Sequence, residues 1–260
     1  MSFMIDLNAD VGERPHALRD GSEEKILGMI SSANIACGAH AGDESTMAQT
    51  VTLCIKHGAA VGAHPSYPDR ANFGRVEMAM TARELEESIF QQVRALGEIA
   101  QAQRTELQYV KPHGALYNVA VRDHDVAETI ARGVARWSRA LALVGLAGTP
   151  MLAVWEAMSF RAVPEAFADR AYEADGTLRG RSKNGALIHS RQQASAQALR
   201  IIKEQCAISI DNVVVPLRAE TLCVHSDTPN AVAILSAVRE QLALADITVS
   251  SFSLRKPSRS

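Results

Sequence analysis

The sequence predicts an α/β fold, a TIM-like barrel of seven parallel strands with a small appended hairpin. Short apolar runs alternate with amphipathic stretches along the chain, the order expected of parallel strands joined by helical crossovers. The 260 residues, 47% of them hydrophobic, suit one β/α barrel, and no repeat or linker divides them. Polar residues also gather where the apolar runs end. We therefore expect a single domain over residues 1–260.

The strands are expected at the short apolar runs, and seven such runs fit the chain better than eight. They are Phe3–Asn8, Ser32–Cys37, Ala60–Ala63, Tyr109–Pro112, Leu141–Leu146, Glu165–Phe167 and Thr221–His225. Two further runs, Ala207–Ile210 and Val213–Val215, flank Asp211-Asn212, which is typical of a two-residue hairpin turn. We expect this hairpin just before the last barrel strand.

Capping residues mark the ends of the helices between these strands. A hydroxyl residue at the N-cap, a Glu or Gln three residues later, or a proline at the first helical position predicts a start. A glycine after the last apolar position predicts a stop. The expected starts are Thr81 with Glu84, Ser190 with Gln193, Thr149-Pro150 and Thr228-Pro229, and the expected stop is Gly58.

Composition excludes several classes of protein. The 27 basic and 29 acidic residues leave a net charge of −2, which argues against nucleic acid as a partner. The four cysteines lie far apart without a C-x-x-C pair, which indicates a reducing compartment. There is no signal-like N-terminus and no apolar run of about 20 residues. We expect a cytoplasmic protein that does not contact membranes.

The first strand ends in an unusual row of polar side chains. Asp6, Asn8 and Asp10 alternate with apolar residues, and the run ends at Gly12. Because every second side chain of a strand points the same way, these three are expected on one side. Buried carboxylates are costly, so such a row indicates a place where a metal ion, a proton or a polar substrate is handled.

Other strand ends carry the same kind of residue. Four of the eight histidines follow predicted strands: His40, His64, His113 and His225. Lys111 lies at the end of a buried strand, where a lysine must be paired or used. Asp169 and Arg170 follow the sixth strand, either as site residues or as a structural ion pair. In a β/α barrel all these ends meet at one rim.

Two kinds of chemistry fit this ring. Asp10, His40 and His64 offer oxygen and imidazole ligands suited to a divalent ion such as Zn, Mn or Mg. Alternatively, carboxylates and histidines act as general acid and base without metal. In that case Lys111 and Arg170 could bind a substrate carboxylate or a transferred phosphoryl group.

No standard phosphate-binding motif is present, neither a P-loop nor a G-x-G-x-x-G after a strand. Residues 176–186 are the nearest candidate, a flexible cationic run that either closes over an anionic group or is a solvated loop. We take Arg181 and Lys183 in it as the predicted nucleotide contacts. Cys37 and Ser66 lack a known activating context for a nucleophile, and no G-x-S-x-G elbow exists.

Taken together, five of these runs resemble the LamB/YcsF family, the family of the A subunit of ATP-hydrolysing 5-oxoprolinase. The resemblance extends from about residue 4 to about residue 250. The runs are Asp6–Glu13, Asn34–Asp43, Gly62–Asp69, Val110–Asn118 and Phe167–Tyr172. The resemblance implies a seven-stranded barrel similar to the glycoside hydrolase/deacetylase superfamily. It also implies ATP-dependent opening of 5-oxo-L-proline (pyroglutamate) to L-glutamate, with ADP and phosphate as products, together with separate B and C subunits.

With this activity, Asp10, His40 and His64 would hold a metal ion or water, and Lys111 and Arg170 the anionic groups. The expected proton-transfer residue is His113 or Glu173. Alanine at His64 or Lys111 is expected to abolish activity with thermal stability nearly intact. Three alternatives stay open: a stand-alone metal-dependent deacetylase or amidohydrolase, a lactam hydrolase of broader range, and a non-catalytic ligand-binding subunit.

Three short stretches depart from the family pattern. They are Arg14-Pro15-His16, where a Ser-Phe-Gly-like run is expected, Arg70-Ala71-Asn72, where a glycine is usual, and Ser226, in place of glycine. The departures bear on loop shape more than on chemistry. Ser226 matters most, because a glycine there could adopt a backbone angle that serine disfavours.

Overall fold

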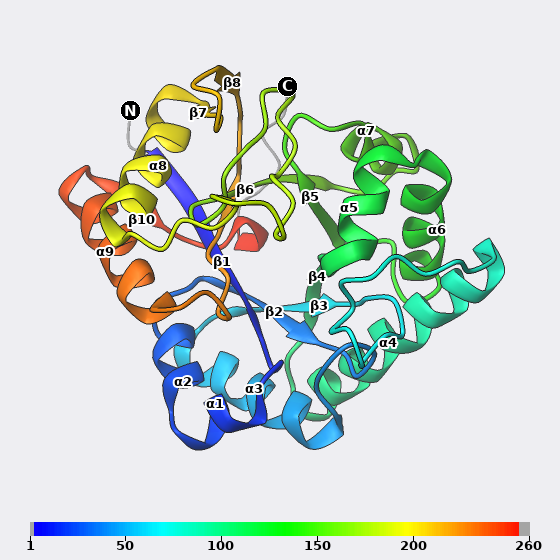
Figure 1. The fold of residues 1–260 in the computed structure, drawn as a ribbon. Coiled ribbons are helices and arrows are strands. Elements are labelled where there is room, and N and C mark those ends of the chain that lie inside the picture. The colour runs from blue at the N-terminus through cyan, green and yellow to red at the C-terminus, as the bar shows by residue number, and fades with distance from the viewer. Residues whose placement is uncertain (1–2, 255–260) are drawn as a thin grey trace.

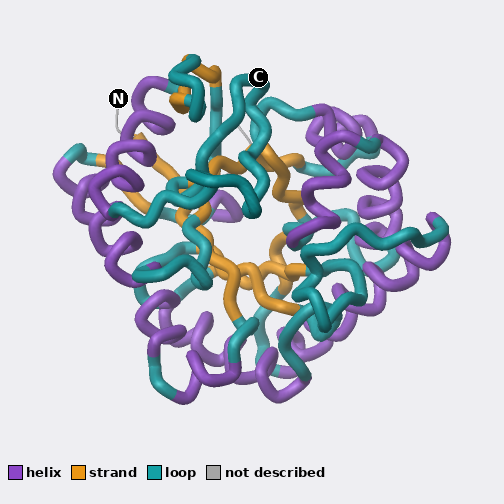
Figure 2. Tube along the Cα trace, in the orientation of Figure 1, coloured by secondary structure: helices purple, strands orange, loops and turns teal. Residues whose placement is uncertain are grey.

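Seven parallel strands form a closed ring at the centre of the molecule, surrounded by helices (Figure 2). The computed structural model describes residues 3–254. The ring runs through β1 (Phe3–Val11), β2 (Ser32–Ala36), β3 (Ala60–His64), β4 (Leu107–Val110), β5 (Ala142–Leu146), β6 (Ala162–Phe167) and β9 (Thr221–Cys223). Pairing of β9 with β1 closes it. The predicted seven-stranded barrel is confirmed.

The helices cover the outside of this ring (Figure 1). They are α1 (Pro15–Arg19), α2 (Ser22–Leu27), α3 (Glu44–His57), α4 (Ala82–Ala102), α5 (Gly114–Arg122), α6 (His124–Ala135), α7 (Pro150–Ala157), α8 (Arg191–Glu204) and α9 (Ala231–Leu244). Thr81 begins α4 with a complete capping box, and Ser190 caps α8. Gly58 ends α3 at a φ of 71°. None of the helices within residues 3–254 is long and apolar enough to cross a membrane.

The predicted start at Thr228-Pro229 is wrong. Helix α9 begins at Ala231, and its N-cap is Asn230, whose φ is 64°. Thr228 instead donates its hydroxyl to the Asp169 carboxylate at 2.6 Å. This buried acceptor lies at the strand exits, so a tertiary contact displaces the local cap.

The appended hairpin lies before β9 as predicted, but its loop is longer. Strands β7 (Cys206–Ile208) and β8 (Val214–Pro216) pair in antiparallel fashion. The Asn212 amide donates to the Ser209 carbonyl at 3.0 Å, and Asn212 has a φ of 61°. The loop is therefore a turn followed by a left-handed residue, one of the common longer hairpin loops, and not a two-residue turn.

Two elements near the end of the described chain were not predicted. Strand β10 (Ile247–Val249) pairs in parallel with the start of β1, outside the closed ring. A 3₁₀ turn, η1 (Phe252–Leu254), then buries Phe252 against Tyr109, with ring centroids 5.2 Å apart. Phe252 and Tyr109 belong to a small apolar cluster distinct from the main core.

The alternation along β1 separates an apolar layer from a polar barrel interior. Ile5, Leu7, Ala9 and Val11 belong to the main hydrophobic core. Asp6, Asn8 and Asp10 are also buried, but they hydrogen-bond to polar side chains of neighbouring strands. The predicted row therefore runs through the interior of the barrel. Asp10, nearest the end of the strand, is the member that reaches the rim.

Candidate functional site

A cavity of about 610 Å³ opens at the carboxyl-terminal rim of the barrel. Its lining includes most of the residues predicted for the site: Asp10, His64, Lys111, His113, Arg170, Arg181 and His225. They come from the exits of five strands of the barrel, β1, β3, β4, β6 and β9. The sequence separation of these residues is large, and the barrel alone brings them together.

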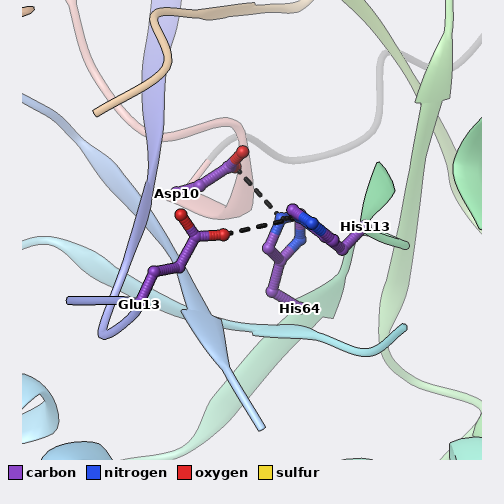
Figure 3. A group of neighbouring side chains, drawn as sticks. All are labelled: Asp10, Glu13, His64 and His113. Carbon is purple, nitrogen blue, oxygen red and sulfur yellow. Dashed lines mark hydrogen bonds and ion pairs between the residues drawn. The ribbon is translucent and has the colours of Figure 1, made fainter. Parts of the chain in front are cut away.

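Four ligand atoms converge beside this cavity, three of them from residues of its lining (Figure 3). They belong to Asp10, Glu13, His64 and His113, all buried, and lie within 4.8 Å of one another. Asp10 Oδ1 is 3.3 Å from His64 Nε2, and Glu13 Oε1 is 3.4 Å from His113 Nδ1. The two histidines approach each other at 3.0 Å, between His113 Nδ1 and His64 Nε2.

The hydrogen bonds of these two imidazoles define where their protons lie. His64 Nδ1 is 2.7 Å from the Lys111 carbonyl, and His113 Nε2 is 2.9 Å from the Phe73 carbonyl. A carbonyl only accepts, so each ring donates from that nitrogen. In the neutral rings His64 Nε2 and His113 Nδ1, which are 3.0 Å apart, therefore both carry a lone pair and no proton. Such a contact requires a shared proton or a cation between them.

His40 lies next to this group and orders it from one side. Its ring stacks on that of His113, with centroids 3.9 Å apart and planes 3° from parallel. Its Nδ1 lies 3.0 Å from Ser66 Oγ and its Nε2 3.1 Å from Glu13 Oε1. Burial lowers the pKa of His40 to about 4. The convergent set thus differs from the predicted Asp10, His40 and His64, because His40 is engaged by Ser66 and Glu13.

Glu13 is a site residue that strand periodicity misses, although it belongs to the first motif. It lies beyond the left-handed Gly12, which turns the chain so that the side chain faces the histidines. Burial and the nearby Asp10 charge raise the pKa of Glu13 to about 7. The histidines beside Glu13 are closely packed by the loop after β3, since a Cβ added to Gly74 would lie 2.9 Å from His40 Cβ.

Lys111 is buried between two carboxylates. Its Nζ is 3.2 Å from Asp10 Oδ1 and 2.8 Å from Glu165 Oε1, and the side chain of Glu165 is fully buried. Burial opposes the charge of Lys111, yet the carboxylates of Asp10 and Glu165 raise its pKa well above the ordinary value. Burial would raise the pKa of Asp10, but His64 and Lys111 hold it well below its usual range. Lys111 is therefore a compensated charge.

Asp169 orients His225 at the β9 exit. Its carboxylate is 3.0 Å from His225 Nδ1 and also accepts from the His225 backbone amide. The His225 ring stacks on Phe167, with centroids 5.3 Å apart. Because Nδ1 faces a carboxylate, the Nδ1-protonated tautomer is favoured, which leaves Nε2 as the basic nitrogen. The sequence places His225 at a strand exit but does not indicate this role.

The segment after β6 covers the cavity with cations, but only part of it faces inward. Arg170 and Arg181 line the cavity. Glu173 forms ion pairs with Arg179 and Lys183, at 3.2 and 3.0 Å, and neither Glu173 nor Lys183 is in the lining. The structure thus does not bring the predicted Glu173 and Lys183 to the cavity lining, and they pair with each other instead.

A three-residue ionic cluster at the rim also escapes prediction from the sequence. Asp227 pairs with Arg75 and with Arg181, in the latter case at 3.2 Å from Nη1 to Oδ2. It thereby connects the loops after β3, β6 and β9. Burial alone would raise the pKa of Asp227, but Arg181, His225 and Arg75 lower it. The signal in the sequence is its place two residues after His225, in the same strand exit.

Two departures from the family pattern contact each other. The Arg14 guanidinium donates to the Ser226 backbone carbonyl. Ser226 is not among the positive-φ residues of the described chain, so serine meets no left-handed strain there. The loop accommodates this substitution in an ordinary conformation.

The convergent group suits a divalent cation by its donor chemistry. Two carboxylates and two imidazoles form a mixed oxygen and nitrogen set of the kind that binds zinc or manganese. Donation of His64 Nδ1 to a backbone carbonyl is the usual support for an imidazole ligand, because it fixes the tautomer. Asp10, Glu13, His64 and His113 therefore form a candidate metal site.

Comparison with known proteins gives consistent matches over nearly the whole chain. The sequence model of the LamB/YcsF family matches residues 5–256. The 5-oxoprolinase A subunit of Chloroflexus aggregans is 51% identical over 245 residues, covering 94% of this chain and 97% of that protein. The 5-oxoprolinase A subunit of Bacillus licheniformis is 41% identical over 249 residues, covering 96% and 98%.

Among solved structures, the lactam utilization protein from Thermus thermophilus superimposes with a TM-score of 0.88. It is 40% identical, and the match covers 96% of this chain and 100% of that one. The barrel described above is thus shared with a relative of known structure.

Proposed function

This chain belongs to the LamB/YcsF family, and on that premise we propose that it is the A subunit of a 5-oxoprolinase. In this proposal it takes part in the hydrolytic opening of 5-oxo-L-proline to L-glutamate, coupled to cleavage of ATP to ADP and phosphate. The names of the relatives support a multi-subunit assembly, and we propose separate B and C subunits as partners. The observation that carries the proposal is the convergence of Asp10, His64, His113 and His225 in one rim cavity.

The chemistry of a lactam explains why such a site is needed. Amide resonance makes the ring carbonyl a poor electrophile. Phosphorylation of the amide oxygen would remove this resonance, so that water could attack the ring carbon. Protonation of the ring nitrogen would then let the C–N bond break, which leaves an acyl phosphate that a second water would hydrolyse to the carboxylate and phosphate. The residues of the site must therefore exclude bulk water, orient the attacking water and move a proton to the ring nitrogen.

His225 is the residue best placed to move a proton. Its Nδ1 is held by Asp169, and the ring borders the cavity. A base whose far nitrogen is fixed by a carboxylate has a defined tautomer and orientation, as general-base catalysis requires. We therefore assign the proton transfer to His225 in place of Glu173, whose carboxylate is paired with Arg179 and is not part of the cavity lining.

A divalent metal ion is the proposed cofactor of the convergent group. Asp10, Glu13, His64 and His113 would hold it, and it would supply Lewis-acid polarisation of the substrate carbonyl. The buried Lys111 keeps Asp10 ionised beside it. Metal analysis of the purified chain tests this assignment directly, since a metal-free preparation that binds neither Zn nor Mn would contradict it.

The functional test is glutamate release from 5-oxoproline by the purified chain, with and without candidate partner subunits and with and without ATP. The proposal predicts release that requires both ATP and the partners. Release by the chain alone without ATP would favour a stand-alone amidohydrolase or a lactam hydrolase, the alternative that the four-residue donor group supports. Release by the assembled subunits that is unchanged in a His64→Ala variant would indicate a non-catalytic role for this chain.

A further inference from the structure

Arg170 is a buried cation whose partners are not acids. The residue is 5% exposed and lines the cavity. Its Nη2 donates to the Arg179 carbonyl at 2.6 Å, and its Nε donates to the Ala186 carbonyl at 3.4 Å. These bonds anchor the guanidinium in the wall and leave its charge without a counter-ion. A charge in this position is costly unless an anion joins it.

Each other lysine or arginine of the lining has a carboxylate partner, although Arg75 and Arg181 share that of Asp227. Arg170 is the exception: no carboxylate within residues 3–254 lies within 4.0 Å of its guanidinium nitrogens. The ion pairs are Lys111 with Asp10 and Glu165, Arg75 and Arg181 with the one carboxylate of Asp227, and Arg122 with Glu77. An anion that enters the cavity therefore meets one guanidinium that no carboxylate of the described residues contacts.

The adjacent acid does not fill this role. Asp169 exerts a favourable field on Arg170, but its oxygens accept from His225 and Thr228. Burial and the nearby charge of Arg181 lower the pKa of Arg170 to about 10, which shows that its environment disfavours the charged form. A bound anion would offset both effects.

We propose that Arg170 is the receptor for the carboxylate of the lactam substrate. The inference rests on the proposed function and specifies how the substrate is held. A guanidinium binds a carboxylate through two parallel hydrogen bonds, and one negative charge neutralises one arginine. In 5-oxoproline the carboxylate is the group that is charged before any phosphorylation, and its two oxygens match the planar guanidinium fork. The carboxylate is therefore the better occupant.

The carboxylate contact also assigns a direction to the substrate. Arg170 comes from the β6 exit, whereas the four-residue donor group comes from the exits of β1, β3 and β4. A lactam anchored at Arg170 could present its ring toward the donor group on the other side of the barrel rim. Cyclic amides without a carboxylate would lack this anchor.

Binding of two lactams to the full chain tests the proposal by calorimetry. The probes are 5-oxoproline and pyrrolidin-2-one, which has the same ring without the carboxylate. The native chain is expected to bind 5-oxoproline at least about tenfold more tightly, and Arg170→Gln is expected to remove that difference. Glutamine keeps an amide donor for the loop carbonyls and loses the charge. Equal binding of both lactams to the native chain would overturn the proposal.

Arg122→Gln is the matched control. Arg122 lines the same cavity, but it is exposed and paired with Glu77, so both affinities should stay unchanged. Pyrrolidin-2-one binding by Arg170→Gln reports that the pocket is intact. If Arg170→Gln no longer binds pyrrolidin-2-one, Arg170→Lys is the variant to measure. A partial loss of affinity for 5-oxoproline, with the affinity for pyrrolidin-2-one unchanged, supports the proposal. Unchanged affinity for 5-oxoproline overturns it.

Inorganic phosphate provides the third arm. One outcome would reassign the subsite to a phosphoryl group and overturn the proposal. In that outcome phosphate binding is lost in Arg170→Gln, while the variant keeps the preference for 5-oxoproline over pyrrolidin-2-one. Retention of the preference in Arg170→Gln without any phosphate effect overturns it as well. ATP-dependent glutamate release by the native chain with its partners tests the proposed function separately, so the two can fail independently.

Discussion

Removal of the Lys111 charge should destabilise the chain substantially, and Lys111→Met is the variant to test. The lysine is 2% exposed and lies 2.8 Å from Glu165 and 3.2 Å from Asp10. Methionine retains most of the volume and, in metal-free protein, leaves the two buried carboxylates without a cation. Breaking a buried ion pair in this way costs about 3–5 kcal/mol. In a chain of this size that lowers Tm by roughly 6–20 °C.

This expectation differs from the one drawn from the sequence, in which alanine at Lys111 leaves stability nearly intact. That expectation is revised because the lysine is part of a buried network of Asn8, Asp10, Glu165 and Cys223. A loss of activity in a Lys111 variant is therefore not by itself a sign of a catalytic role.

Urea denaturation at two pH values measures the effect. In Lys111→Met the two carboxylates favour protonation in the folded state, so the folded chain binds more protons than the unfolded one. Stability should then fall as pH rises, and the deficit should be smaller at about pH 5.5 than at about pH 7.5. Glu165→Gln added to Lys111→Met should recover at least about 1 kcal/mol. The exposed Lys56→Met, paired with Glu24, is the control and should show no measurable change. Stability of Lys111→Met within about 1 kcal/mol of native at neutral pH would refute the reasoning.

Three further predictions concern the convergent group. Asp10→Asn should weaken Zn or Mn binding at least about tenfold in a competition titration, and unchanged affinity would remove Asp10 from the metal site. Because burial raises the folded-state pKa of Glu13 to about 7, above its usual 4.5, stability should fall as pH rises between these values in metal-free protein. Glu13→Gln should reduce this slope but not abolish it, because burial also raises the pKa of Glu23 to about 7. An unaltered slope would show that Glu13 does not contribute to it. Gly74→Ala should lower the free energy of unfolding in urea by about 1–3 kcal/mol, because Gly74 has a φ of 64° and the added Cβ would clash with His40. Unchanged stability would show that the loop adjusts without cost.

The barrel was predictable from the sequence because its signals are local. Strand–helix alternation, the Thr81 capping box and the Gly58 stop each depend on a few neighbouring residues. Thr228 shows the limit: its hydroxyl caps no helix because Asp169, 59 positions away, accepts from it. Local pattern carries no information about such a partner.

The site was predictable in its location and only partly in its membership. Strand-exit positions identified Asp10, His64, Lys111 and His113, since all exits of a barrel share one rim. Glu13 lies beyond the end of its strand, where the left-handed Gly12 sets its direction, and periodicity does not reach that far. Whether a charged residue is free or compensated also depends on distant partners.

The charge partners supplied by distant residues differ between Lys111 and Arg170. Both were predicted to hold anionic groups, and both are buried cations in the cavity wall. Glu165 neutralises Lys111 from another strand, whereas the partners of Arg170 are backbone carbonyls. The sequence contains both residues in similar positions, and the folded structure distinguishes their roles.

The most direct measurement of the central claim is kcat for glutamate release by the chain assembled with its partner subunits, native against His64→Ala. His64 Nε2 lies 3.3 Å from Asp10 and 3.0 Å from His113, at the centre of the convergent group. We predict a loss of at least about 100-fold in kcat for a variant that remains folded by circular dichroism. A folded His64→Ala variant with kcat within about twofold of native would contradict the assignment of this cavity as the active site.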